Sequence, residues 1–302
     1  MSANLEKAFH NEPAAKIKSK KESSIYRFFA NLFRSWTGTL GFIIILGLLF
    51  ISIFGPWITP YDPLYADFSK KLLPPMTDGH LLGTDQLGRD ILSRIIVGAR
   101  VSVIIGVLTV VIAGIFGTVV GIISGYFRGW VDVVLMRIVD VQLSFPFILL
   151  VLVINAIIGA GLRNIIISLA IGGWVIFARM IRSEVLALRE KEFITACVAT
   201  GVSRFEILFR HILPNLFTPL IILASLQIGT FIIAEASVSF LGFGVQPPEP
   251  AWGNMLNEGK DYIFSSWWLI TFPGIAIIIA ALGVNLFGDW LRDTLDPELK
   301  GE

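Results

Sequence analysis

Long stretches without a charged side chain constrain this chain more than any other feature of its sequence. A helix rises about 1.5 Å per residue, so about 20 apolar residues cross a hydrocarbon layer about 30 Å thick. Five runs lack Asp, Glu, Lys and Arg over most or all of that length, and a sixth is bounded by Arg163 and Arg179. Buried helices of a large soluble protein do not account for so many such runs. We therefore predict an all-α, polytopic membrane protein with one six-span domain at 37–295, whose spans lie at about 37–58, 101–125, 139–159, 162–181, 213–241 and 264–288.

The positions of Lys and Arg predict the orientation of these spans. Six spans place both termini on one side, which then carries 17 of the 24 Lys and Arg residues, against 7 on the other side. Cytoplasmic loops are enriched in Lys and Arg. We therefore expect a multi-pass protein of the bacterial plasma (inner) membrane with both termini in the cytoplasm and with outward loops at 59–100 and 243–262. The single cysteine, Cys197, excludes an intrachain disulfide.

The two ends of the chain differ from the spans in composition. Residues 1–23 are polar and Lys-rich, so we predict a disordered cytoplasmic tail. In 24–36, apolar residues recur at helical spacing opposite Arg27 and Arg34, which predicts an interfacial elbow helix on the cytoplasmic leaflet; a simple extension of the first span is the alternative. No A-x-A-like cleavage site follows 37–58, so we expect a retained anchor. Residues 296–302 are predicted to form a second cytoplasmic tail.

Glycine and proline indicate how the spans pack. Gly117, Gly121 and Gly125 recur every fourth residue, which gives a smooth helix face that another helix backbone can approach closely. Pro146 lies inside the third predicted span and is expected to kink it.

Six polar side chains lie in or near the spans. Because buried polar groups are costly in lipid, we expect them to face the bundle interior or a wet cavity. For each one, a hydrogen bond between helices is favoured over a contact with a substrate. Glu235 is the strongest exception, because it is the only acid well inside a span. These possible translocation-path or packing residues are Asp140, Gln142, Asn155, Gln227, Glu235 and Asn285.

Both outward loops contain turn-forming residues. Leu81 to Asp90 combines glycines with two Asp-containing turns, which could bind a cation but more often cap the backbone. In the second loop, Trp252 to Ile263 has helical apolar spacing after three prolines, which predicts a short helix at the outer interface.

The cytoplasmic loop at 183–212, and above all the overlapping segment 192–215, carries the strongest functional signal. Phe193 to Thr200 is a good helical stretch, Gly201 suits the left-handed position that ends a helix, and Ser203 followed by Glu206 predicts a capping box. We expect Phe205, Leu208, Phe209 and Ile212 to share one face of the second helix. Such an ordered, apolar helix–turn–helix is expected to dock onto another protein, although packing on its own bundle alone is the alternative.

The same segment resembles the EAA loop of ABC importer permeases. Thr195-Ala196-Cys197 stands for Glu-Ala-Ala, Gly201 matches the glycine, and His211-Ile212-Leu213-Pro214 stands for Ile-x-Leu-Pro. Thr195, Cys197 and His211 depart from the pattern, although Glu192 lies one turn earlier. Further stretches resemble the dipeptide, oligopeptide and nickel permeases, and in particular their second, C-type subunit: His80 to Arg94, Pro247 to Leu256, Gly288 to Asp293 and Leu295-Asp296-Pro297.

This resemblance implies a non-catalytic subunit that pairs with a sister permease as a heterodimer in the lipid membrane. Two ABC ATPase subunits would carry ATP and Mg, and an extracytoplasmic solute-binding protein would deliver a dipeptide or oligopeptide. It implies no cofactor, metal or catalytic residue on this chain, and no nucleic acid partner. The implied ATPase-coupling residues are Glu192, Thr195, Ala196, Cys197, Gly201, Arg204, Phe205, His211, Pro214 and Asn215.

Other classes fit the sequence less well. The chain has no phosphate-binding Gly-x-x-x-x-Gly-Lys-Ser/Thr, no His-Glu-x-x-His and no Gly-x-Ser-x-Gly motif, which argues against an ATPase or an intramembrane hydrolase. A secondary transporter driven by an ion gradient is the better rival, but such proteins are often built from two related halves and this chain has one loop of this kind. Nickel, glutathione or another small solute remain alternative cargoes.

Overall fold

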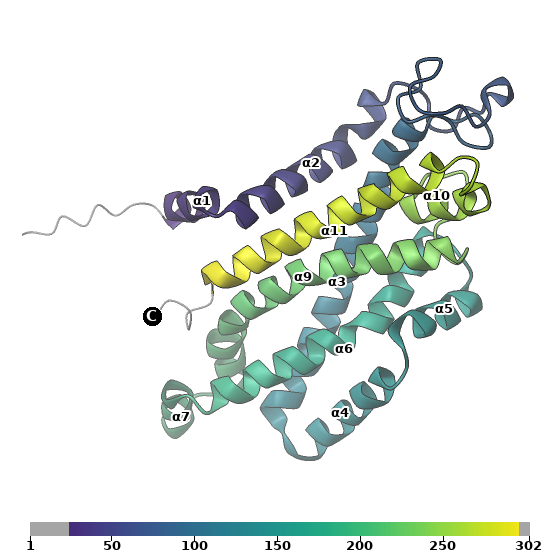
Figure 1. Cartoon of the computed structure of the whole chain (residues 1–302). Helices are drawn as coiled ribbons and strands as arrows, with labels where there is room; N and C mark the ends of the chain where they lie inside the picture. Colours follow the sequence, from purple (N-terminus) through teal and green to yellow (C-terminus); the bar gives the residue numbers. More distant parts are fainter. Residues whose placement is uncertain (1–23, 296–302) are drawn as a thin grey trace, which may run out of the picture.

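The structure is a computed structural model that describes residues 24–295, so the predicted tails at 1–23 and 296–302 lie outside the described residues. Within that range the chain is helical without strands, which confirms the predicted all-α class. Figure 1 shows an elongated helical bundle, with α1, α7 and the C-terminal end of α11 at one end and α10 and the 59–90 loop at the other. The helices are α1 Ser24–Arg34, α2 Trp36–Ile58, α3 Ile91–Phe127, α4 Gly129–Leu143, α5 Phe147–Ile158, α6 Leu162–Arg189, α7 Glu192–Ala199, α8 Arg204–Glu206, α9 Leu213–Phe240, α10 Trp252–Gly259 and α11 Trp268–Leu295, with a π-helical segment at Ile207–Ile212 and short 3₁₀ turns at Phe68–Lys70 and Lys260–Tyr262.

Five of these helical stretches are long and apolar enough to cross a membrane, and the pair α4 and α5 provides a sixth if the two count as one span. The pair is bent by 89°, at the place where Pro146 was expected to kink the third span. Pro146 explains the break, because it lacks a backbone N–H and disfavours helical geometry in the residue before it.

The helix that contains the second predicted span is longer than that span. We expected a span at 101–125, and α3 begins ten residues before it, at Ile91. Asp90 caps the helix there, because its Oδ2 accepts a hydrogen bond from the backbone N–H of Ser93 at 2.8 Å. The first turns of α3 therefore project beyond the apolar run, toward the 59–90 loop.

The glycine stripe of α3 packs against α6, as its spacing predicted. A Cβ atom added at Gly121 would lie 2.7 Å from the carbonyl oxygen of Ala178, and one added at Gly125 would lie 2.9 Å from that of Arg182. Added at Gly117, it would collide with the carbonyl oxygen of Trp174. The backbones of α3 and α6 are therefore in direct contact along this glycine stripe.

The first helix, α1, is separate from α2. The chain breaks at Ser35, whose hydroxyl accepts a hydrogen bond from Gly38 N at 3.2 Å and so starts a new helix. Leu32 of α1 is buried against Trp290 and Leu291 of α11. α1 is therefore a separate helix rather than an extension of α2, as an interfacial helix requires. The position of α1 on a membrane surface stays a prediction.

Candidate functional site

The coupling elbow, residues 192–215, turns sharply after α7. Gly201 has φ of +78°, Val202 N donates to Cys197 O at 3.0 Å, and Gly201 N donates to Val198 O at 3.1 Å. These two bonds form a Schellman motif, which satisfies the last carbonyls of α7. Ser203 then caps the next helix by accepting from Glu206 N at 3.2 Å. The turn that the sequence predicted is therefore present.

The predicted apolar stripe of the second elbow helix is wrong. Residues 207–212 form a π-helix, in which hydrogen bonds join residues five apart, so Ile207 and Ile212 share the buried face. Phe205 and Phe209 instead point outward and are 74% and 66% exposed. The π-helical turn thus separates buried Ile212 from the two exposed aromatic rings that were expected on the same face.

The elbow is anchored to the bundle beneath it. Ile194 of α7 packs with Ile207 and Ile212 in one apolar cluster, which also contains Tyr126 of α3 and Ile181 of α6. Its buried face is therefore continuous with the ends of α3 and α6, the two helices that meet along the glycine stripe.

The residues proposed for coupling lie mostly on the outer surface of this elbow. Cys197 and His211, two of the departures from the family pattern, are half-buried and face each other, with Sγ and Nε2 3.8 Å apart. Asn215 donates its side-chain amide to His211 O at 2.6 Å, which secures the start of α9. The exposed members are Glu192, Thr195, Ala196, Gly201, Arg204, Phe205, Pro214 and Asn215.

Ion pairs that sequence reasoning missed join the corner between α3 and α4 to the end of α6. Arg182 binds Asp132 with two hydrogen bonds, Nε to Oδ1 at 2.5 Å and Nη2 to Oδ2 at 2.6 Å. The Arg128 guanidinium donates to Glu190 at 2.5 Å, and this hydrogen bond holds the pKa of the Glu190 carboxyl below its usual value. The pairing residues are about 50–60 positions apart in sequence, so no local pattern signals them.

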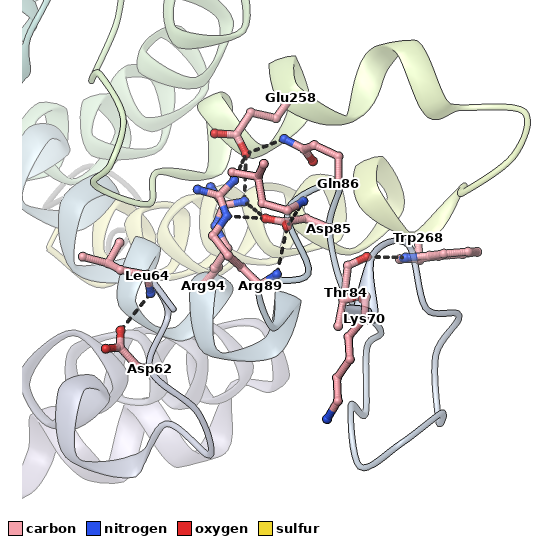
Figure 2. Close-up of polar contacts among 11 residues, drawn as sticks. Asp62, Leu64, Lys70, Thr84, Asp85, Gln86, Arg89, Arg94, Glu258 and Trp268 are labelled. Carbon is pink, nitrogen blue, oxygen red and sulfur yellow. Dashed lines mark hydrogen bonds and ion pairs between the residues drawn. The ribbon is translucent and has the colours of Figure 1, made fainter. Parts of the chain in front are cut away.

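At the opposite end of the bundle, the ion cluster of Asp85, Arg89, Arg94 and Glu258 ties the 59–90 loop to α10 (Figure 2). Asp85 Oδ2 accepts from Arg89 at 2.6 Å and from Arg94 at 2.5 Å, and Glu258 Oε2 accepts from the same two arginines at 2.7 and 2.8 Å. Burial raises the pKa of Glu258, but the hydrogen bonds and charges of the arginines outweigh it, so the pKa of this carboxyl lies below its usual value. Asp85 and Asp90 thus bind protein groups, and the described residues contain no group of metal-type ligands.

Four of the six polar residues in the spans bond to their own chain. Gln142 donates to the carbonyls of Ile171 and Gly172 at 2.7 and 3.0 Å and accepts from Trp174 Nε1. Buried Asn155 donates to Ser168 Oγ at 2.5 Å. Glu235 is fully buried and accepts hydrogen bonds from Ser239 at 2.7 Å and from Ser102 at 3.3 Å. Asp140 is exposed and forms an ion pair with Arg179.

Gln227 belongs to α9 and Asn285 to α11, and these two helices contact each other. The Oε1 atom of Gln227 is buried without a partner among the described residues. Asn285 Oδ1 lies against Gly229, where an added Cβ would approach it to 2.8 Å. The structure therefore gives these two amides a packing environment within the bundle.

Comparison with known proteins adds a family context. The model described as "Binding-protein-dependent transport system inner membrane component" matches residues 117–301, and the model of the N-terminal TM domain of oligopeptide transport permease C matches residues 23–75. The dipeptide transport system permease protein DppC of Alkalihalophilus pseudofirmus is 44% identical over 90% of this chain and 89% of its own length. The di/tripeptide transport system permease protein DppC of Pseudomonas aeruginosa is 39% identical over 97% of this chain and 98% of its own length.

Two further relatives broaden the comparison. The glutathione transport system permease protein GsiD of Escherichia coli is 42% identical over 86% of each chain. Among solved structures, an inward-facing form of the MetNI methionine ABC transporter aligns with a TM-score of 0.57 at 18% identity, covering 68% of this chain and 98% of the other. At that identity the match establishes a shared fold.

Proposed function

The chain belongs to the family of binding-protein-dependent transport system inner membrane components, and within it to the C-type permeases of dipeptide and oligopeptide ABC importers, and from this premise we propose that it forms half of the path by which such peptides cross the membrane. The peptide cargo rests on the relatives that are named for dipeptides. A relative named for glutathione makes that solute the second candidate.

The observation that carries the proposed mechanism is the coupling elbow. One face of the elbow is buried against the ends of α3 and α6, while Phe205 and Phe209 are exposed on its surface. Exposed aromatic side chains on an ordered support are typical anchors for a protein partner. We propose that they enter a cleft on an ABC ATPase subunit, so that closure of the nucleotide sites moves the spans.

The partners follow from this assignment. A sister permease would complete the path, two ATPase subunits would bind ATP and Mg, and an extracytoplasmic solute-binding protein would deliver the peptide. The elbow end of the bundle, with α1 and the end of α11, would face the cytoplasm together with both termini, and the 59–90 loop and α10 would face outward. The chain itself would be non-catalytic, since its sequence carries no phosphate-binding loop.

Uptake of a labelled dipeptide by reconstituted vesicles tests the proposal. We expect uptake that needs ATP, the binding protein and this subunit together. Uptake that survives ATP depletion but stops when an ion gradient collapses would assign the chain to secondary transport instead.

A crosslinking experiment tests the elbow on its own. Cys197 is the single cysteine of the chain and lies within the elbow. We expect it to crosslink to the ATPase subunit in at least one nucleotide state. An active transporter in which no nucleotide state gives that crosslink would refute docking through this surface.

A further inference from the structure

Three charged side chains lie exposed on neighbouring turns of α4 and α6. Asp140 and Arg179 form an ion pair of 2.5 Å between Oδ1 and Nη2, in which the side chains are 56% and 57% exposed. Arg137 is also exposed and stands three residues before Asp140, so it lies on the adjacent turn of α4. No acidic side chain of residues 24–295 pairs with Arg137. This charged strip (Arg137, Asp140 and Arg179) therefore carries a net charge of about +1.

The charged strip lies at the cytoplasmic ends of the predicted spans. Asp140 is the second residue of the span predicted at 139–159, and Arg179 stands two residues before the end of the span predicted at 162–181. A translocation path opens toward the cytoplasm at this level, so exposed charged groups there can meet a cargo that leaves the membrane.

A groove opens beside the strip, at the break between α4 and α5. It has a volume of about 350 Å³ and is lined by Arg137, Gln142 and apolar side chains, among them Ile138, Phe145 and Ile171. The side-chain amide of Gln142, a residue of α4, is already hydrogen-bonded to α6. Arg137 is therefore the polar group of the groove that is left to bind a ligand. A concave, mostly apolar surface with few polar groups is typical of small-molecule sites.

We propose that the charged strip and this groove bind the charged ends of the peptide cargo during its passage. Arg137 and Arg179 hold the terminal carboxylate, because a guanidinium matches a carboxylate with two parallel hydrogen bonds. Asp140 accepts the terminal ammonium, and the groove takes an apolar side chain. Because the Asp140–Arg179 pair is more than half exposed, exchanging partners costs little. This inference rests on the proposed function, since it names where that cargo touches this subunit.

The first test asks whether the groove is wet. Ile138→Cys is made in a Cys197→Ala background, with the background alone as reference, and the rate of modification by a charged, water-soluble thiol reagent is measured in the assembled transporter. Ile123→Cys, on the exposed side of α3 and two residues before the end of the span predicted at 101–125, is the matched control for a lipid-facing position at the same end of the bundle. We expect Ile138→Cys to react at least tenfold faster than this control and to be protected by peptide during turnover. Equal rates would place the groove against lipid and overturn the inference.

The second test measures ATP-dependent uptake per assembled transporter, with saturating binding protein. Arg137→Gln is expected to slow uptake of a neutral dipeptide about tenfold, Arg137→Lys less so, and Arg163→Gln, at the exposed outer start of α6, not at all. The C-terminal amide of the same dipeptide is expected to be insensitive to Arg137→Gln.

Two results would overturn this assignment. Uptake by Arg137→Gln equal to that of Arg163→Gln would show that Arg137 does not touch the cargo. An equal loss for the dipeptide and its amide would place the role of Arg137 elsewhere than on the carboxylate. Failure of the proposed function itself looks different, because the wild-type transporter would then show no ATP-dependent dipeptide uptake.

Discussion

Replacing Arg94 tests whether the ion cluster holds the 59–90 loop against α10. The Arg94 side chain is 2% exposed, and its Nη1 donates to Asp85 at 2.5 Å and to Glu258 at 2.8 Å. Arg94→Met keeps much of the volume but removes the charge, which leaves two carboxylates to share Arg89. Removing one partner of a buried ion pair costs about 3–5 kcal/mol of unfolding free energy.

That cost is large enough to measure as a melting temperature. For a chain of this size, 1 kcal/mol corresponds to about 2–4 °C, so we expect Arg94→Met to lower the Tm of the detergent-purified transporter by about 10 °C. Arg100→Met is the matched control, because Arg100 is an exposed arginine of the same helix and its loss should change the unfolding free energy by less than about 0.5 kcal/mol.

A double-mutant cycle separates the ion pair from general damage. Arg94→Met and Glu258→Gln remove partners of the same contact, so their combined effect should differ from the sum by about 0.5–3 kcal/mol. A Tm for Arg94→Met within about 1 °C of that for Arg100→Met, or additive effects in the cycle, would refute the view that this cluster fastens the loop.

Three further predictions concern other parts of the molecule. The pKa of Glu258 lies below its usual value in the folded state, so its ion pairs stabilise the fold at a pH above the unfolded-state pKa and are lost as the pH falls through the folded-state pKa. The Tm of the wild type should therefore drop in acid more steeply than that of Glu258→Gln. Parallel curves of Tm against pH would contradict this. Gly121→Val should lower the yield of folded protein, because forcing α3 away from the backbone of α6 costs about 1–3 kcal/mol of unfolding free energy. Gly47→Val, in open space on α2, is the control and should leave the yield unchanged. Equal yields of the two variants would contradict the close approach of α3 and α6. Phe209→Ser should reduce ATP-dependent uptake at least tenfold with an unchanged yield of folded protein. Phe264→Ser, at a fully exposed position before α11 at the opposite end of the bundle, is the control and should not reduce uptake. Normal uptake by Phe209→Ser would show that this ring is not part of the docking surface.

Several features of the fold could be predicted because their causes are local. Uncharged runs are long enough to cross a membrane, the spacing of Gly117, Gly121 and Gly125 leads to backbone contact with α6, and the signals at Gly201 and Ser203 lead to the turn of the elbow. The early start of α3 also had a signal, since Asp90 followed by Ser93 is a capping pattern.

Other features depend on contacts that a local pattern does not contain. The π-helical turn places Ile207 and Ile212 on one face because both pack against the same cluster under the elbow. Glu258 joins the ion cluster across more than 160 residues of sequence. The angle of 89° at Pro146 likewise has no local signal, and after the break the ring of Phe147 packs against Gly172 of α6.

The packing around the elbow suggests how a push from an ATPase would travel. Close-packed interiors transmit displacement rather than absorb it, and the elbow shares one apolar cluster with Tyr126 and Ile181. Along the glycine stripe the backbones of α3 and α6 touch, so neither helix can move far alone. The Arg182–Asp132 pair carries the start of α4 with them, whereas the break at Pro146 leaves α5 less constrained. We therefore expect α3, α6 and α4 to move as one unit that hinges at this break, which would widen or narrow the groove beside Arg137 with each nucleotide cycle.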